Sequence, residues 1–73
     1  MTKLGEYLAK RSVNKSQVAK RTGLTKARMN ELTLTDTAKL RAEELYLIAL
    51  AIKVNPCEML SDLCEGVALV SES

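Results

Sequence analysis

The 73-residue sequence has no histidine, tryptophan or phenylalanine, and only two tyrosines. Without histidine it lacks the commonest general base, and it also lacks a glycine-rich loop that could cradle phosphates. Proteins that stack unpaired bases on aromatic platforms need more aromatic side chains than this, which argues against a single-strand or RNA binder. Strands also favour aromatics, and no alternating apolar run is bounded by turns. The sequence therefore predicts an all-α fold.

Only two cysteines are present, and they do not suit a metal site or a disulfide. Cys57 and Cys64 lie in one predicted helix, where seven residues rise roughly 10 Å and forbid a bridge between them. Their spacing is not that of zinc ligands, and no serine or cysteine has a base available. We therefore expect no catalytic residue, no metal, no cofactor and a reduced, cytoplasmic setting. The two thiols are interpreted as small core or interface residues, with a redox sensor bridging two subunits as the open alternative.

Long hydrophobic runs are also missing. The longest, residues 45–52, is far too short to cross a bilayer, and the N-terminal MTKLGEYLAKR has no apolar segment like that of a signal peptide. We expect no membrane partner. An apolar content of 47% in so short a chain predicts one globular domain, which we place at residues 1–66, followed by a short tail at 67–73.

Acidic charge is scarce in the first part of the chain. Residues 1–41 carry ten of the eleven basic side chains and three acidic ones, a net charge of +7, whereas residues 42–73 carry a net charge of −5. Both sets can simply solvate a surface. So lopsided a separation is better explained by a polyanion that binds the basic half.

The most informative stretch is residues 13–32, VNKSQVAKRTGLTKARMNEL, which predicts two short helices and a tight turn. Asn14 is a good N-cap for a helix over residues 15–22, and Thr25 is a good N-cap for a helix over residues 26–32. Gly23 stands where the first helix must end in a left-handed residue. Two such helices joined by a short glycine turn predict a helix-turn-helix.

Three more helices are predicted around this motif. The first covers residues 2–11, with Gly5 weakening it by about 1 kcal/mol relative to alanine. After a loop at residues 33–40, a nearly all-apolar helix covers residues 41–53. Asn55 caps the last helix, with Pro56 in its first turn and Gly66 at its end.

The helix-turn-helix and the three helices around it resemble the phage repressor and Cro-like family, often called XRE, over about residues 4–64. The matching positions include the cap and first residue of the motif's first helix, its apolar-alanine pair, its turn, the apolar residue of the second helix and a downstream apolar signature. They are Asn14, Lys15, Val18, Ala19, Gly23, Leu24, Thr25, Met29, Ile48, Ala49, Ile52 and Val54. The resemblance implies a five-helix lambda-repressor-like DNA-binding domain with the helix-turn-helix at its second and third helices.

Two positions depart from the family pattern. Many members pair an arginine in the first helix with a glutamate after the third, and the corresponding residues here are Leu8 and Thr33. Loss of both partners is consistent, because one alone would leave a buried charge unpaired.

The resemblance implies a transcriptional regulator that binds double-stranded DNA with its third helix in the major groove. Helical geometry turns four side chains outward to contact base edges: Lys26, Ala27, Asn30 and Glu31. Four basic side chains are predicted to contact phosphates: Lys15, Arg28, Lys39 and Arg41. The open alternative is an antitoxin or protein-interaction module, whose partner would be a toxin and whose DNA binding would serve autoregulation.

A homodimer on DNA is also expected, because one two-turn helix contacts only a few base pairs. The predicted interface combines the last helix with the outer side of the fourth: Leu50, Met59, Leu63 and Cys64. The alternative is that these side chains pack under the apolar tail of the same monomer.

Overall fold

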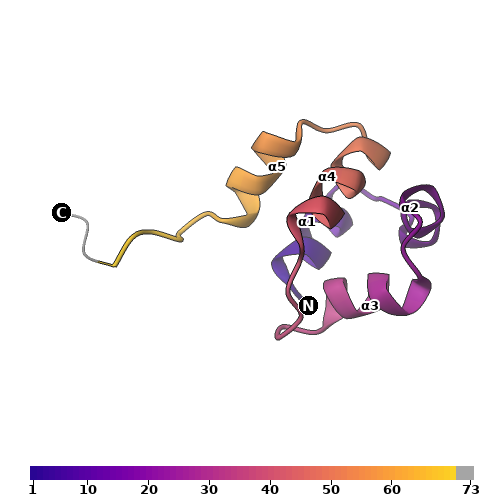
Figure 1. Cartoon of the computed structure of the whole chain (residues 1–73), viewed down its shortest axis with the longest axis horizontal. Helices are drawn as coiled ribbons and strands as arrows, with labels where there is room; N and C mark the ends of the chain where they lie inside the picture. The colour runs from indigo at the N-terminus through magenta and orange to yellow at the C-terminus, as the bar shows by residue number, and fades with distance from the viewer. Residues whose placement is uncertain (71–73) are drawn as a thin grey trace.

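Five α-helices enclose one core in the computed structural model, which describes residues 1–70 (Figure 1). They are α1 (Lys3–Lys10), α2 (Lys15–Thr22), α3 (Lys26–Leu34), α4 (Ala42–Ala51) and α5 (Pro56–Leu63). No strand occurs in this part of the chain. The all-α, five-helix prediction is confirmed.

The helices begin where the sequence places their caps. The Oδ1 atom of Asn14 accepts the Gln17 N–H at 3.1 Å, and the Oγ1 atom of Thr25 accepts the Arg28 N–H at 3.0 Å. Asn55 does the same for the second and third residues of α5. Gly23 ends α2 with φ 83°, a conformation that a residue with a β-carbon adopts at a cost. These local signals set the helix-turn-helix.

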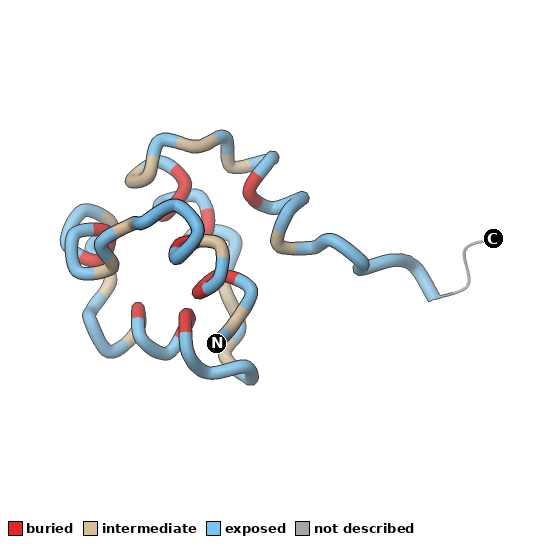
Figure 2. The backbone as a smooth tube through the Cα atoms, turned by 180° about the vertical axis from the view of Figure 1, so that it is seen from behind, coloured by how far each residue is buried: buried red, intermediate tan, exposed pale blue. Residues whose placement is uncertain are grey.

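The core is made of apolar side chains from all five helices, and their positions are red in Figure 2. Ala19 allows α2 to approach its neighbours closely, and Ile48 on the inner side of α4 has no exposed surface. The buried hydrophobic residues are Leu4, Leu8, Val18, Ala19, Met29, Leu32, Leu45, Ile48, Ala49 and Met59. A single core thus fixes α2 and α3 against the rest of the domain.

Gly5 is where α1 crosses the end of α3. A β-carbon at this position would lie 2.3 Å from the carbonyl oxygen of Thr33. Close approach lets the Thr2 N–H donate to that same oxygen at 3.0 Å, while the Thr2 hydroxyl donates to the Leu32 carbonyl at 2.7 Å. The N-terminus of α1 therefore caps the carboxyl end of α3.

The carboxyl ends of α3, α4 and α5 differ from the sequence prediction, and α5 ends at Leu63 rather than near Gly66. Helix α3 continues to Leu34, two residues into the predicted loop, because Thr33 is buried and its hydroxyl donates to the Met29 carbonyl at 2.9 Å. Helix α4 ends at Ala51, and Lys53 has φ 61° just beyond it.

Past Gly66 (φ 90°) residues 67–70 run away from the helical body (Figure 1). Val67, Leu69 and Val70 are exposed, so within the described residues the apolar tail does not cover α4 or α5. The alternative that the apolar tail packs over these helices therefore does not hold for residues 67–70.

Candidate nucleic-acid interface

The turn between α2 and α3 is fixed by one hydroxyl group and by the buried core. Thr22 donates its hydroxyl to the Val18 carbonyl at 2.8 Å and accepts the Leu24 N–H at 3.3 Å. Leu24 packs partly against the core, so the turn is held on both sides of Gly23. This fixes the direction in which α3 leaves α2 (Figure 1).

Helix α3 presents one face to the core and the other to solvent. Met29, Leu32 and Thr33 are buried, and the outward face consists of the four predicted base-contacting residues, all exposed: Lys26, Ala27, Asn30 and Glu31. A shallow depression of about 130 Å³ brings Lys15 and Ser16 of α2 beside Lys26 and Asn30. The structure thus gathers polar side chains of both motif helices around one hollow.

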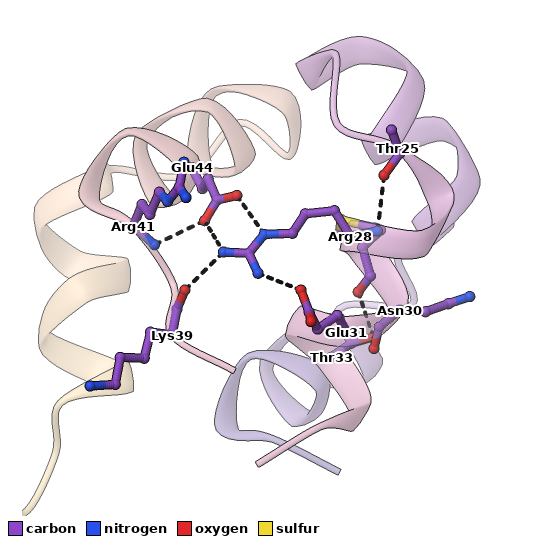
Figure 3. Close-up of polar contacts among 9 residues, drawn as sticks. Thr25, Arg28, Asn30, Glu31, Thr33, Lys39, Arg41 and Glu44 are labelled. Carbon is purple, nitrogen blue, oxygen red and sulfur yellow. Dashed lines mark hydrogen bonds and ion pairs between the residues drawn. The ribbon is translucent and has the colours of Figure 1, made fainter. Parts of the chain in front are cut away.

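Arg28 does not project into solvent as predicted, and its guanidinium lies between α3 and α4 (Figure 3). Its Nε and Nη2 atoms donate to the two carboxylate oxygens of Glu44 at 2.8 and 2.9 Å. The Nη2 atom also donates to the Lys39 carbonyl at 2.9 Å, and Nη1 donates to Glu31. Because Arg28 makes four side-chain hydrogen bonds to protein acceptors, the prediction that it contacts a phosphate is corrected.

Glu44 is the buried half of this ion pair, with only 7% of its surface exposed. Its Oε1 atom also accepts the backbone N–H of Arg41 at 2.9 Å, which caps the first turn of α4. Donation from Arg28 lowers the pKa of the Glu44 carboxyl, and its burial opposes this only in part. The same contacts raise the pKa of Arg28, so the pair stays charged.

The other three predicted phosphate-contacting residues keep accessible side chains. Lys39 and Arg41 are exposed, and Lys39 points away from the Arg28 cluster in Figure 3. Lys15 is half-buried, and its Nζ atom donates to the Thr33 hydroxyl at 3.4 Å. One of these three cations lies at the start of α2, and the other two lie in the segment before α4.

The Arg28–Glu44 pair had no clear signal in the sequence. The two residues are 16 positions apart, and Arg28 falls on the shoulder of α3, where helical geometry fits a buried or a solvent-facing side chain equally. Leu8 and Thr33, which replace the family's usual ion pair, are each only 1% exposed. An uncharged pair thus fills that place, and the Arg28–Glu44 ion pair joins α3 to α4.

The predicted dimer residues are not gathered on one exposed surface. Met59 has no exposed surface and belongs to the core of its own monomer, so its assignment to the interface is wrong. Leu63 is half-buried against that core, whereas Leu50 is 51% exposed and Cys64 is also exposed. Exposure of both cysteines also corrects the prediction that they could be core residues. The large exposed hydrophobic side chains of α4 and α5 are Tyr46, Leu47, Leu50 and Leu60.

Comparison with known families gives one match: the model of the Cro/C1-type HTH DNA-binding domain matches residues 3–65. The matched region begins at the first residue of α1 and ends just after α5. Comparison with curated proteins and with solved structures gives no significant match. Among residues 1–70, no helix has the length and apolar character needed to cross a membrane.

Proposed function

Since the chain belongs to the Cro/C1-type helix-turn-helix family of DNA-binding domains, we propose that it is a sequence-specific transcriptional regulator that binds double-stranded DNA with α3 in the major groove. The observation that carries this proposal is the outward face of α3, with its four exposed side chains of different chemistry. That face lies in the basic half of the chain, which carries a net charge of +7. A phosphate backbone on either side of the groove would be attracted to this half.

Each of these four side chains suits a different base edge. Lys26 can donate to guanine, Asn30 can bridge the acceptor and donor of adenine, and the Ala27 methyl group can contact the thymine methyl. Glu31 can accept an N–H from the amino group of cytosine. We propose these four residues as the base contacts.

Phosphate contacts are assigned to Lys15, Lys39 and Arg41. Lys15 is the first residue of α2, where the backbone N–H groups also favour an anion. Arg41 precedes α4, and its side chain is exposed while its N–H is bonded to Glu44. Such contacts set register and add affinity without choosing the sequence.

We further propose that two copies bind one operator. One copy of α3 spans nine residues and contacts few base pairs, so useful specificity requires a second half-site about 10 base pairs away. The acidic residues that follow position 41 would lie away from the phosphates in such a dimer.

Selection of bound duplexes from a random DNA pool tests the proposal directly. The wild-type protein should enrich one sequence, and its affinity should fall steeply with salt concentration. A protein that enriches no sequence, or whose affinity does not change with salt, is not a DNA-binding regulator of this kind.

Two alanine variants then separate base contacts from phosphate contacts. Asn30→Ala should change the preferred base at one position and leave the salt dependence unchanged. Arg41→Ala should weaken all sequences alike and reduce the slope of log affinity against log salt by about 1. If both variants changed the preferred sequence equally, the division would be wrong.

A further inference from the structure

The Arg28 guanidinium joins two parts of the proposed interface to the buried carboxylate of Glu44 (Figure 3). It contacts Glu31 on the outward face of α3, Glu44 on α4, and the backbone at Lys39 between these helices. We propose that Arg28, held by Glu44, is a positioning residue that fixes the base-contacting carboxylate of Glu31 and the phosphate-contacting segment 39–41 relative to one another. This inference rests on the proposed function.

The hydrogen bonds of Arg28 leave little capacity for a phosphate. A guanidinium has five N–H groups, and Arg28 makes four hydrogen bonds to protein acceptors. Its contact with Glu44 is bidentate, which fixes the plane of the group as well as its position. One positive charge also lies between two carboxylates, so the cluster has no excess positive charge with which to attract DNA.

Glu31 needs such a partner if it is to contact a base. Its side chain is 52% exposed, and a free carboxylate near phosphates would be repelled by them. Arg28 donates to the Oε1 atom of Glu31, which offsets its charge and restricts its rotamers. The Oε2 atom can then accept an N–H from a cytosine amino group at a fixed place in the groove.

The same cluster holds the backbone on both sides of Leu40. Arg28 donates to the Lys39 carbonyl, and Glu44 accepts the Arg41 N–H. The Arg28–Glu44 ion pair therefore holds the backbone from which the exposed side chains of Lys39 and Arg41 extend. Phosphate contacts made from this segment would place α3 at one depth and register in the groove.

Arg28→Lys is the decisive variant, because it keeps the positive charge and removes the planar fork. A lysine would serve nearly as well as arginine in a simple phosphate contact. We define the affinity ratio as the affinity for the selected DNA divided by the affinity for the same DNA with the Glu31-contacted base pair replaced. The positioning role predicts that this ratio is at least about 10-fold lower in Arg28→Lys than in the wild type. Binding to unrelated DNA should weaken less than binding to the selected sequence. The ratio is measured well below each variant's thermal midpoint, so a purely structural role would not move it.

Glu44→Gln gives a second, independent test. It removes a negative charge, so long-range electrostatics alone would tighten binding to every duplex. The positioning role predicts weaker binding to the selected sequence and a lower affinity ratio. Arg21→Lys is the matched control, because Arg21 makes its single hydrogen bond to the Ala51 carbonyl, away from α3, and its ratio should equal that of the wild type.

The outcomes distinguish this inference from the proposed function. A wild-type protein without sequence preference overturns both. A wild-type protein that selects a sequence, with Arg28→Lys and Glu44→Gln retaining the same affinity ratio, overturns the positioning role alone. Weaker binding to all duplexes with an unchanged affinity ratio also overturns it, because the positioning of Glu31 requires the ratio to fall. The expected result is a lower affinity ratio in Arg28→Lys and Glu44→Gln and a wild-type ratio in Arg21→Lys.

Discussion

Gly5 shows how one residue can be unfavourable for its helix and necessary for the fold. Alanine is a better helix former than glycine by about 1 kcal/mol, so helix propensity alone predicts that Gly5→Ala stabilises the protein. In this fold the added β-carbon would lie 2.3 Å from the Thr33 carbonyl oxygen, which is backbone and cannot move aside easily. We expect Gly5→Ala to lower the free energy of unfolding by about 1–3 kcal/mol, as measured by urea titration.

Ala9→Gly in the same helix is the control for propensity. Ala9 is exposed, so its substitution should cost about 1 kcal/mol with no steric contribution. A Gly5→Ala protein more stable than wild type would show that α1 does not approach α3 as closely as the structure places it.

At the scale of single residues, the sequence predicts features that depend only on residues nearby in the chain, such as helix caps. The caps Asn14, Thr25 and Asn55 and the left-handed Gly23 act within one helical turn of themselves, and all four are as predicted. The role of Gly5 was missed, because its constraint comes from Thr33, 28 positions along the chain.

At the scale of helices, the Arg28–Glu44 ion pair between α3 and α4 makes the stability of the fold depend on pH. The pKa of Glu44 is lower in the folded protein than in the unfolded chain, so the ionised carboxylate stabilises the fold. This contribution is complete above the unfolded pKa of about 4.3 and is lost as pH falls through the lower folded pKa. The thermal midpoint should therefore fall on acidification below about pH 4, and Glu44→Gln should show a flatter curve.

Thermal melts of the two proteins across this pH range measure the effect. The stability difference between wild type and Glu44→Gln should shrink as the pH falls. Glu43→Gln removes the same charge from the exposed neighbouring side chain and controls for the change in net charge. If the curves of wild type and Glu44→Gln ran parallel, Glu44 would not supply the acid sensitivity.

Contacts between helices could not be predicted from the sequence. The apolar side of α5 was recognised, but a periodic pattern cannot tell which of its residues face the monomer's own core and which face a partner. Met59 proved to be core, whereas Leu60 of the same helix is 51% exposed. Arg28 could not be assigned either, because a long side chain on a helix shoulder takes the direction of its partner, and Glu44 lies on another helix.

The whole molecule separates charge along the chain and leaves apolar surface on its acidic part. Residues 1–41 are basic and expose the large hydrophobic side chains of Met1 and Leu34, whereas the acidic part that follows exposes four on α4 and α5 alone. In the proposed complex this surface would lie away from the DNA, where it is suited to a two-fold contact between copies. Leu63 is a poor site for testing it, because it also packs against the monomer core.

Leu50 offers the cleaner test of the dimer, because half of it is exposed and its loss leaves the core intact. Leu50→Glu places a charge in the proposed contact, so it should abolish cooperative binding to a two-half-site operator and reduce the dimer fraction in sedimentation equilibrium. Affinity for a single half-site and the thermal midpoint should stay near the wild-type values. Val67→Glu makes the same charge change on the exposed tail and should leave cooperativity intact. Full cooperativity in a folded Leu50→Glu protein would exclude the outer side of α4 from the dimer. If Val67→Glu also lost cooperativity, the tail would be assigned to the contact between copies.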